Sequence, residues 1–137
     1  MTHYAQLLQE HELKATFQRI QILEVIERVG HIAIERIYEE VSRIHTSLSL
    51  ATIYKNILLM VERGVLTEVS IIGQKSKYEI SKADHIHLVC IECGEVVDKA
   101  LDDTTAENTL HVAETSGFSL DHRQVNLYGV CGACKSK

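Results

Sequence analysis

Two C-x-x-C pairs, Cys90 with Cys93 and Cys131 with Cys134, constrain the fold of this chain more than any other feature. Two thiolates from each pair complete the tetrahedral ligand set of a Zn²⁺ ion, and one such ion would tie the C-terminal tail back to much earlier strands. A four-thiolate site is closed, so we expect a structural zinc rather than a catalytic one. The other interpretation is that these are buried or redox cysteines without a metal.

Length and composition are typical of a folded soluble protein. The chain has 137 residues, 45% of them hydrophobic, which suits one ordinary domain or two very small ones. The N-terminus lacks the apolar core of a signal peptide, and the longest apolar run, residues 57–61, is too short to cross a membrane. We therefore expect a cytoplasmic protein without a membrane partner, in which the cysteines stay reduced and available to a metal.

Helical periodicity followed by two short strands predicts a winged helix-turn-helix domain over residues 1–80. Apolar residues recur every three or four positions, Ser49 is a plausible N-cap, and Gly30 and Gly64 are plausible helix ends. In such a domain the last helix lies in the DNA major groove and the hairpin contacts the backbone. Periodicity equally allows a small helical domain with an ordinary solvated face. The predicted helices cover residues 17–30, 34–41 and 49–64, and the predicted hairpin turns at residues 73–75.

Net charge gives no positive support for a nucleic-acid partner. Residues 1–80 carry 9 Lys or Arg against 10 Asp or Glu, a net charge of −1, and residues 81–137 carry 5 against 9, a net charge of −4, so the two parts sum to the formal −5. A near-neutral first part still allows a local basic face. The candidate DNA contacts on the outward face of the last helix are Ser49, Thr52, Tyr54, Lys55 and Asn56.

Residues 81–137 predict a small α+β domain with ligand-rich strands. We expect strands over 87–92 and 95–101, a helix over 104–117, and a strand over 118–131. A domain of this size is marginally stable unless a metal or a partner copy supports it. The overall fold class is therefore α+β, with a zinc-stapled second domain.

A second metal site is indicated beside the first C-x-x-C pair. His85 and His87 alternate on one side of a predicted strand, and Asp98 follows on the next strand, so the three side chains are expected to share one pocket. Each of them alone has an ordinary explanation as a surface group. Spacing gives no reason to add His31 or Glu79 to this set.

Four sequence motifs, given below in chain order, resemble those of the ferric uptake regulator (Fur) family of metal-dependent bacterial repressors, and in detail its peroxide-sensing PerR branch. The resemblance implies a winged-helix DNA-binding domain, a C-terminal dimerisation domain in residues 81–137, a four-cysteine zinc site and a regulatory Fe²⁺ or Mn²⁺ site. It also implies Arg19 as a phosphate contact. The motifs are ATFQRIQILEVI, SLATIYKNILLMVERGVL, DHIHLVCIECG and LYGVCGAC. By position, the resemblance assigns the regulatory metal to His31, Glu79, His85, His87 and Asp98.

The resemblance implies a homodimeric repressor that binds an inverted-repeat operator and senses hydrogen peroxide through iron-catalysed oxidation of a ligand histidine, His31 or His85. Asp98, where the iron-uptake branch more often has Glu, favours the peroxide-sensing branch, as does the absence of an H-H-D-H motif. Two positions depart from the pattern: Phe17 replaces a proline, and Glu79 replaces an aspartate. An iron-responsive repressor without peroxide sensing therefore remains the alternative.

Two other classes of function remain open on sequence grounds. A zinc enzyme would use the His/Asp cluster as an open site with an activated water, although the sequence offers no spare general base. A redox protein would use one C-x-x-C pair as a dithiol, which leaves the helix-turn-helix without a purpose. We therefore expect a regulator and not an enzyme.

Overall fold

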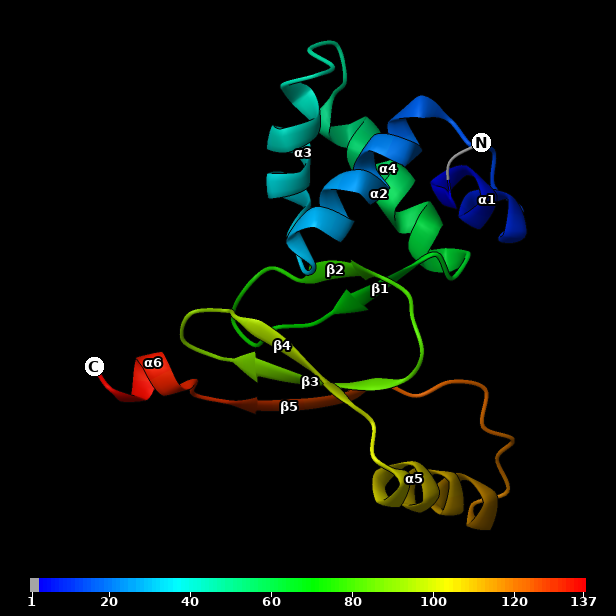
Figure 1. The fold of residues 1–137 in the computed structure, drawn as a ribbon, viewed down its shortest axis with the longest axis vertical. Helices are drawn as coiled ribbons and strands as arrows, with labels where there is room; N and C mark the ends of the chain where they lie inside the picture. The colour runs from blue at the N-terminus through cyan, green and yellow to red at the C-terminus, as the bar shows by residue number, and fades with distance from the viewer. Residues whose placement is uncertain (1–2) are drawn as a thin grey trace. The chain divides into compact units, whose positions relative to one another are not determined.

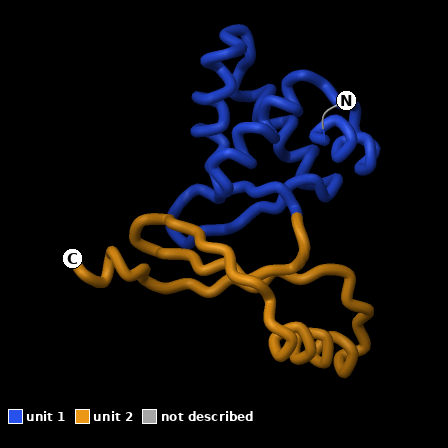
Figure 2. Tube along the Cα trace, viewed as in Figure 1, with its two compact units in different colours: residues 1–81 blue, residues 82–137 orange. Residues whose placement is uncertain are grey.

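The computed structural model describes residues 3–137, and the chain divides into two units, residues 1–81 and residues 82–137 (Figure 2). The elements of both units are labelled in Figure 1. Among the described residues, no helix combines the length and hydrophobicity that crossing a bilayer requires.

The first unit begins with four helices, and the second and fourth have side-chain caps at their N-termini. The Thr16 hydroxyl caps the second helix by accepting from Arg19 N–H, and Gly30, at φ 96°, ends it. Ser49 caps the fourth helix by accepting from Thr52 N–H. These are the caps that the sequence predicted for residues 17–30 and 49–64, apart from Thr16. The helices are α1 (His3–Glu10), α2 (Phe17–Val29), α3 (Ile34–Ser42) and α4 (Leu50–Glu62).

The hydrophobic core of the first unit lies between these helices. Ile26 of α2, Ile37 of α3 and Ile57 of α4 are completely buried, and Leu8 brings α1 onto the same core. Helix α1 was not predicted, because a helix of eight residues is too short to be stable by itself and depends on this contact with the core.

A two-stranded hairpin completes the first unit. Strands β1 (Leu66–Val69) and β2 (Lys77–Ile80) pair antiparallel. The segment after α2 joins this hairpin, because Ile32 and Tyr78 exchange backbone hydrogen bonds of 2.9 and 3.2 Å. Helices α2 to α4 with this hairpin form the winged helix-turn-helix that the sequence predicted.

A three-stranded sheet forms the centre of the second unit. Its order is β4 (Val96–Ala100), β3 (His85–Cys90), β5 (Val125–Gly129), with β4 antiparallel and β5 parallel to β3. Helix α5 (Asp103–Thr115) connects β4 to β5, and the short helix α6 (Gly132–Lys135) follows β5. The mixed α+β fold expected for the chain is confirmed.

The last strand is shorter than the sequence predicted. Alternating residues predict a strand over 118–131, but only Val125–Gly129 pairs with β3, beginning opposite Ile86. Residues 118–124 extend past the beginning of β3, so their backbone has no strand beside it to complete a ladder. This segment instead forms the return connection from α5.

The second unit has a thin core, since few of its apolar side chains are buried. Val89 and Cys90 are buried, whereas Leu127 of β5 is 53% exposed and Val112 of α5 is 65% exposed. A unit of this size gains little stability from such a core. It therefore needs a metal or a partner surface for support.

Candidate functional site

The four cysteines converge at one end of the three-stranded sheet. Cys90 ends β3, and Cys93 lies in the turn to β4. Cys131 is the N-cap of α6, and Cys134 lies within α6. Their sulfur atoms all lie within 4.8 Å of one another, and Cys93 Sγ is 3.8 Å from Cys131 Sγ. A tetrahedral zinc with Zn–S bonds of about 2.3 Å separates its sulfurs by about 3.8 Å. The sulfur positions therefore fit a zinc ion.

The electrostatics of this cluster also favour a bound cation. Backbone N–H groups of Cys93 and Cys131 donate to the Cys90 sulfur, which lowers the pKa of the Cys90 thiol to about 6. The hydrogen bond from Cys131 and burial raise the pKa of the Cys134 thiol. A bound divalent cation would favour the thiolate form of all four cysteines, because each ligand must be deprotonated.

His85, His87 and Asp98 lie together at the other end of β3. The antiparallel register places His87 directly opposite Asp98. Asp98 Oδ1 is 3.6 Å from His85 Nε2 and 3.5 Å from His87 Nε2, and these two nitrogens are 2.8 Å apart. The structure thus brings together the three residues that the strand alternation placed in one pocket. Lys82 Nζ also pairs with Asp98 Oδ2.

The Nδ1 atoms of both imidazoles bond to groups outside the cluster, so that the Nε2 atoms face Asp98. His85 Nδ1 bonds to the Ala83 carbonyl oxygen at 2.9 Å, and His87 Nδ1 bonds to Asn126 Oδ1 at 2.9 Å. Both partners are acceptors, so each Nδ1 is the protonated nitrogen and each Nε2 carries a lone pair. Two lone pairs at 2.8 Å repel, and a shared cation or proton relieves that repulsion. The positions of the two Nε2 atoms therefore suit a pair of metal ligands.

His31 and Glu79 form a second cluster, in the first unit. His31 Nε2 lies 2.8 Å from Glu79 Oε2. The pairing of Ile32 with Tyr78 sets this contact, because His31 and Glu79 flank that pair in the sequence. Glu79 is 2% exposed, and a carboxylate so deeply buried needs a cation or strong donors to remain charged. The imidazole of His31 is one such group.

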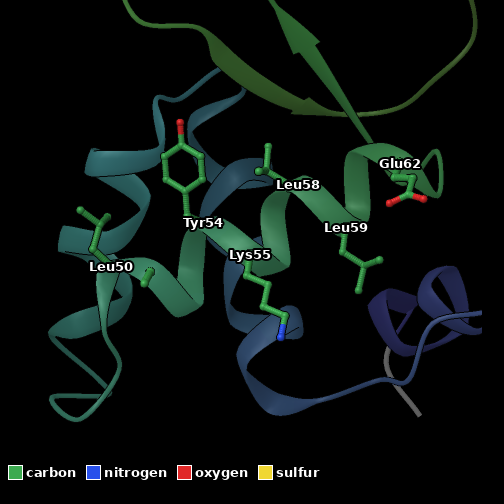
Figure 3. A pocket seen from close by; sticks show the side chains of 7 residues that line it. Leu50, Tyr54, Lys55, Leu58, Leu59 and Glu62 are labelled. Atoms are coloured by element: carbon green, nitrogen blue, oxygen red, sulfur yellow. The ribbon is translucent and has the colours of Figure 1, made fainter.

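The candidate DNA-contacting residues lie on and beside α4. Ser49 Oγ and Thr52 Oγ1 are 3.0 Å apart at the helix start, so both take part in the cap. Tyr54 and Lys55 are exposed. Figure 3 shows them along the outward side of α4 with Leu50 and Leu58, around a shallow pocket. This side therefore offers an aromatic ring, aliphatic groups and one positive charge.

Arg19 and Asn56 contact each other. Arg19 Nε donates to Asn56 Oδ1 at 3.0 Å, and Arg19 Nη1 donates to the Lys14 carbonyl oxygen at 2.8 Å. Asn56 Nδ2 in turn donates to the Thr52 carbonyl oxygen. The bond between Arg19 and Asn56 links α2 to α4 and places the Arg19 charge beside the polar face of α4.

Sequence reasoning missed two polar residues that support the histidine cluster, Asn126 and Lys82. Asn126 lies opposite His87 only because β5 pairs in parallel with β3. Nothing in the local sequence pattern specifies which strand becomes the neighbour of β3. Lys82 has no periodic or motif signal either, although its charge beside the DHIH segment was visible in the sequence.

Comparison with known sequences gives a consistent family match. The sequence profile described as "Ferric uptake regulator family" matches residues 10–128. The ferric uptake regulation protein of Vibrio anguillarum is 33% identical over 140 residues, covering 98% of this chain and 93% of that protein. The peroxide operon regulator of Bacillus subtilis is 30% identical over 131 residues, covering 95% of this chain and 90% of that protein.

Solved structures show the same fold. The Campylobacter jejuni peroxide stress regulator has a TM-score of 0.78 and 37% identity, covering 94% of this chain and 97% of that one. The Vibrio cholerae ferric uptake regulator has a TM-score of 0.75 and 32% identity, covering 93% of this chain and 98% of that one. Both structures match nearly the whole chain, so the similarity includes both units.

Proposed function

Because the chain belongs to the ferric uptake regulator family of metal-dependent transcription regulators, we propose that it is a DNA-binding repressor that senses hydrogen peroxide. Members of this family are transcription regulators rather than enzymes. The observation that carries the proposal is the pair of histidine Nε2 atoms that converge with Asp98 at the opposite end of β3 from the cysteine cluster. Such an oxygen and imidazole donor set suits Fe²⁺ or Mn²⁺.

The structural metal in this proposal is Zn²⁺, held by Cys90, Cys93, Cys131 and Cys134. The sulfur spacing and the shortage of buried side chains in the second unit support this assignment. Four convergent thiols also argue against the dithiol alternative, in which one C-x-x-C pair would act alone.

The regulatory metal is proposed to bind His31 and Glu79 of the first unit together with His85, His87 and Asp98 of the second. Each set is already internally paired, by the His31–Glu79 contact and by the contacts of Asp98 with both histidines. An ion that takes ligands from both units favours one arrangement of them. Shifting an equilibrium from 1:99 to 99:1 requires about 5.5 kcal/mol of differential affinity, which a multidentate ion can supply.

In this proposal, peroxide ends repression by oxidising a histidine ligand of the regulatory metal. When bound, Fe²⁺ supplies the redox chemistry that activates hydrogen peroxide. One oxygen atom of the peroxide enters a ring C–H bond of His31 or His85, and the other leaves as water, so the imidazole is oxidised by two electrons and the peroxide is reduced. The altered ring is a poorer ligand, and the metal-bound form is lost.

DNA recognition in this proposal uses α4 in the major groove. Tyr54 and Lys55 are exposed on this helix. Ser49 and Thr52 lie at its N-terminal end, which is proposed to lie near the groove. Arg19 and Asn56 are proposed to act as a bonded pair beside this face. The partner is a double-stranded operator with inverted repeats, because a two-fold homodimer presents two such helices.

The test compares operator binding by the Fe²⁺ form before and after peroxide with binding by the Mn²⁺ form. We expect both metals to promote binding, and peroxide to abolish it only in the Fe²⁺ form. The zinc content, measured in parallel, should not change. Operator binding that survives peroxide in the Fe²⁺ form would contradict the proposal.

An iron-responsive repressor without peroxide sensing is the second candidate. The similarity to ferric uptake regulation proteins and the glutamate at position 79 favour it. In that case operator binding follows Fe²⁺ concentration, and brief peroxide treatment leaves both histidines unmodified.

A further inference from the structure

Arg123 makes a three-way link within the second unit. Its Nε donates to Asp84 Oδ2 at 2.8 Å, and its Nη1 donates to the Ala106 carbonyl oxygen at 2.9 Å and to Thr109 Oγ1 at 2.6 Å. Its side chain is 21% exposed. Arg123 comes from the return segment before β5, Asp84 from the residue before β3, and the other two partners from α5. One guanidinium thus joins three separate parts of the unit.

Helix α5 has little else to hold it in place. None of its residues, all of which the structure describes, is buried. Figure 1 shows α5 set off from the three-stranded sheet, with a connecting segment at each end. Thr109 Oγ1 donates to the Thr105 carbonyl oxygen at 2.8 Å, so its lone pairs remain available to accept from Arg123. Within one protomer, the bonds from Arg123 are therefore a substantial part of what attaches α5 to the rest of the unit.

The strand side of the link lies directly beside the histidine cluster. Asp84 precedes His85 in the chain, and His85 Nδ1 bonds to the carbonyl oxygen of Ala83. Residues 83–85 therefore make two contacts. The Ala83 carbonyl oxygen orients the His85 ring, and the Asp84 carboxylate pairs with Arg123. A ligand that fixes His85 must also fix the segment that Arg123 contacts.

Building on the proposed function, we propose that Arg123 is a positioning residue that couples metal binding at His85 to the ordering of α5. A planar guanidinium presents several N–H donors in fixed directions and can bond a carboxylate and a helix at the same time. A metal ion that holds His85 thereby strengthens the attachment of α5. By linkage, an ordered α5 also raises the affinity for the metal.

Hydrogen exchange of the α5 amides tests the coupling in the full-length, zinc-loaded protein, with and without Mn²⁺. In the unmodified protein we expect Mn²⁺ to slow exchange across α5 by about fivefold, the low end of typical coupling between sites. Arg123→Lys retains a charge for Asp84 but lacks the second donor arm, so we expect it to reduce the slowing to less than about twofold. Mn²⁺ affinity, measured by titration, should fall by the same factor.

Two further variants separate the two arms of the link. Thr109→Val removes the acceptor on α5, and Asp84→Asn removes the carboxylate charge before β3, while both keep Arg123. Each is expected to lose most of the Mn²⁺-dependent slowing. Lys99→Gln is the matched control, because Lys99 is an exposed cation on β4 of the same unit. It should respond to Mn²⁺ like the unmodified protein.

The ratio of exchange rates with and without Mn²⁺ distinguishes coupling from a purely structural role. Loss of a structural contact alone speeds exchange equally in both conditions and leaves the ratio unchanged. An unchanged ratio in Arg123→Lys, Thr109→Val and Asp84→Asn overturns the inference. If the unmodified protein binds Mn²⁺ and the operator but α5 exchange does not respond, only the coupling fails. If Mn²⁺ does not bind, the proposed function fails with it.

Discussion

Replacing Asn126 should weaken the proposed regulatory metal site without changing any of its proposed ligands. Asn126 Oδ1 accepts from His87 Nδ1 at 2.9 Å, and His87 is 1% exposed, so no water replaces a lost acceptor. In Asn126→Leu the Nδ1–H is buried and unsatisfied, which costs about 1–3 kcal/mol. The alternative tautomer avoids this cost but places the proton on Nε2, the nitrogen that faces Asp98. Metal binding must then reverse the tautomer, so the cost appears as lost affinity.

The expected loss is therefore about 10- to 100-fold in Mn²⁺ affinity, the range typical of an outer partner of a ligating histidine. Asn126→Asp keeps an oxygen acceptor at the same place and should bind Mn²⁺ at least as tightly as the unmodified protein. Isothermal titration of zinc-loaded protein at constant pH measures both variants. Unchanged affinity in Asn126→Leu, with normal zinc content, would refute the reasoning that His87 is a ligand through Nε2.

Three other predictions test the remaining sites. Cys131→Ser should lose zinc and lower the thermal midpoint by at least about 8 °C, since each kcal/mol shifts a small domain by about 4–8 °C; retained zinc and stability in calorimetry would exclude the site. Lys55→Ala should reduce the salt slope of operator binding by about 0.9 per protomer if Lys55 touches one phosphate, and an equal slope would remove it from the phosphate contacts. Peroxide should add the mass of one oxygen to a peptide carrying His31 or His85 in the Fe²⁺ form and none in the Mn²⁺ form, and oxidation confined to the cysteines would make the thiols the sensor.

Local signals in the sequence predicted most of the first unit. Ser49 and Gly30 have chemical roles that do not depend on the rest of the fold, so the C-terminal end of α2 and the N-terminal end of α4 were accessible from the sequence. Helix α1 escaped detection, because its formation depends on burying Leu8 against helices that are distant in the sequence.

The candidate site divides in the same way. The cysteine pairs and the alternation of His85 with His87 are local patterns, and both correspond to clusters in the structure. Asn126 and Arg123 were not predictable, because their roles depend on the parallel pairing of β5 and on the path of the return segment. Their partners are about 39 residues away in the chain, beyond the reach of any periodicity argument.

The six residues of β3 carry ligands of both proposed metal centres, with His85 and His87 near one end and Cys90 at the other. Successive side chains of a strand point to opposite faces, so inserting or deleting one codon between His87 and Cys90 would turn one ligand set away from its ion. Most point substitutions between the ligands leave both ligand sets in place, whereas a one-residue change in the length of the strand cannot keep both. Over evolution, the length of β3 should therefore be inherited more strictly than the identity of Leu88 within it.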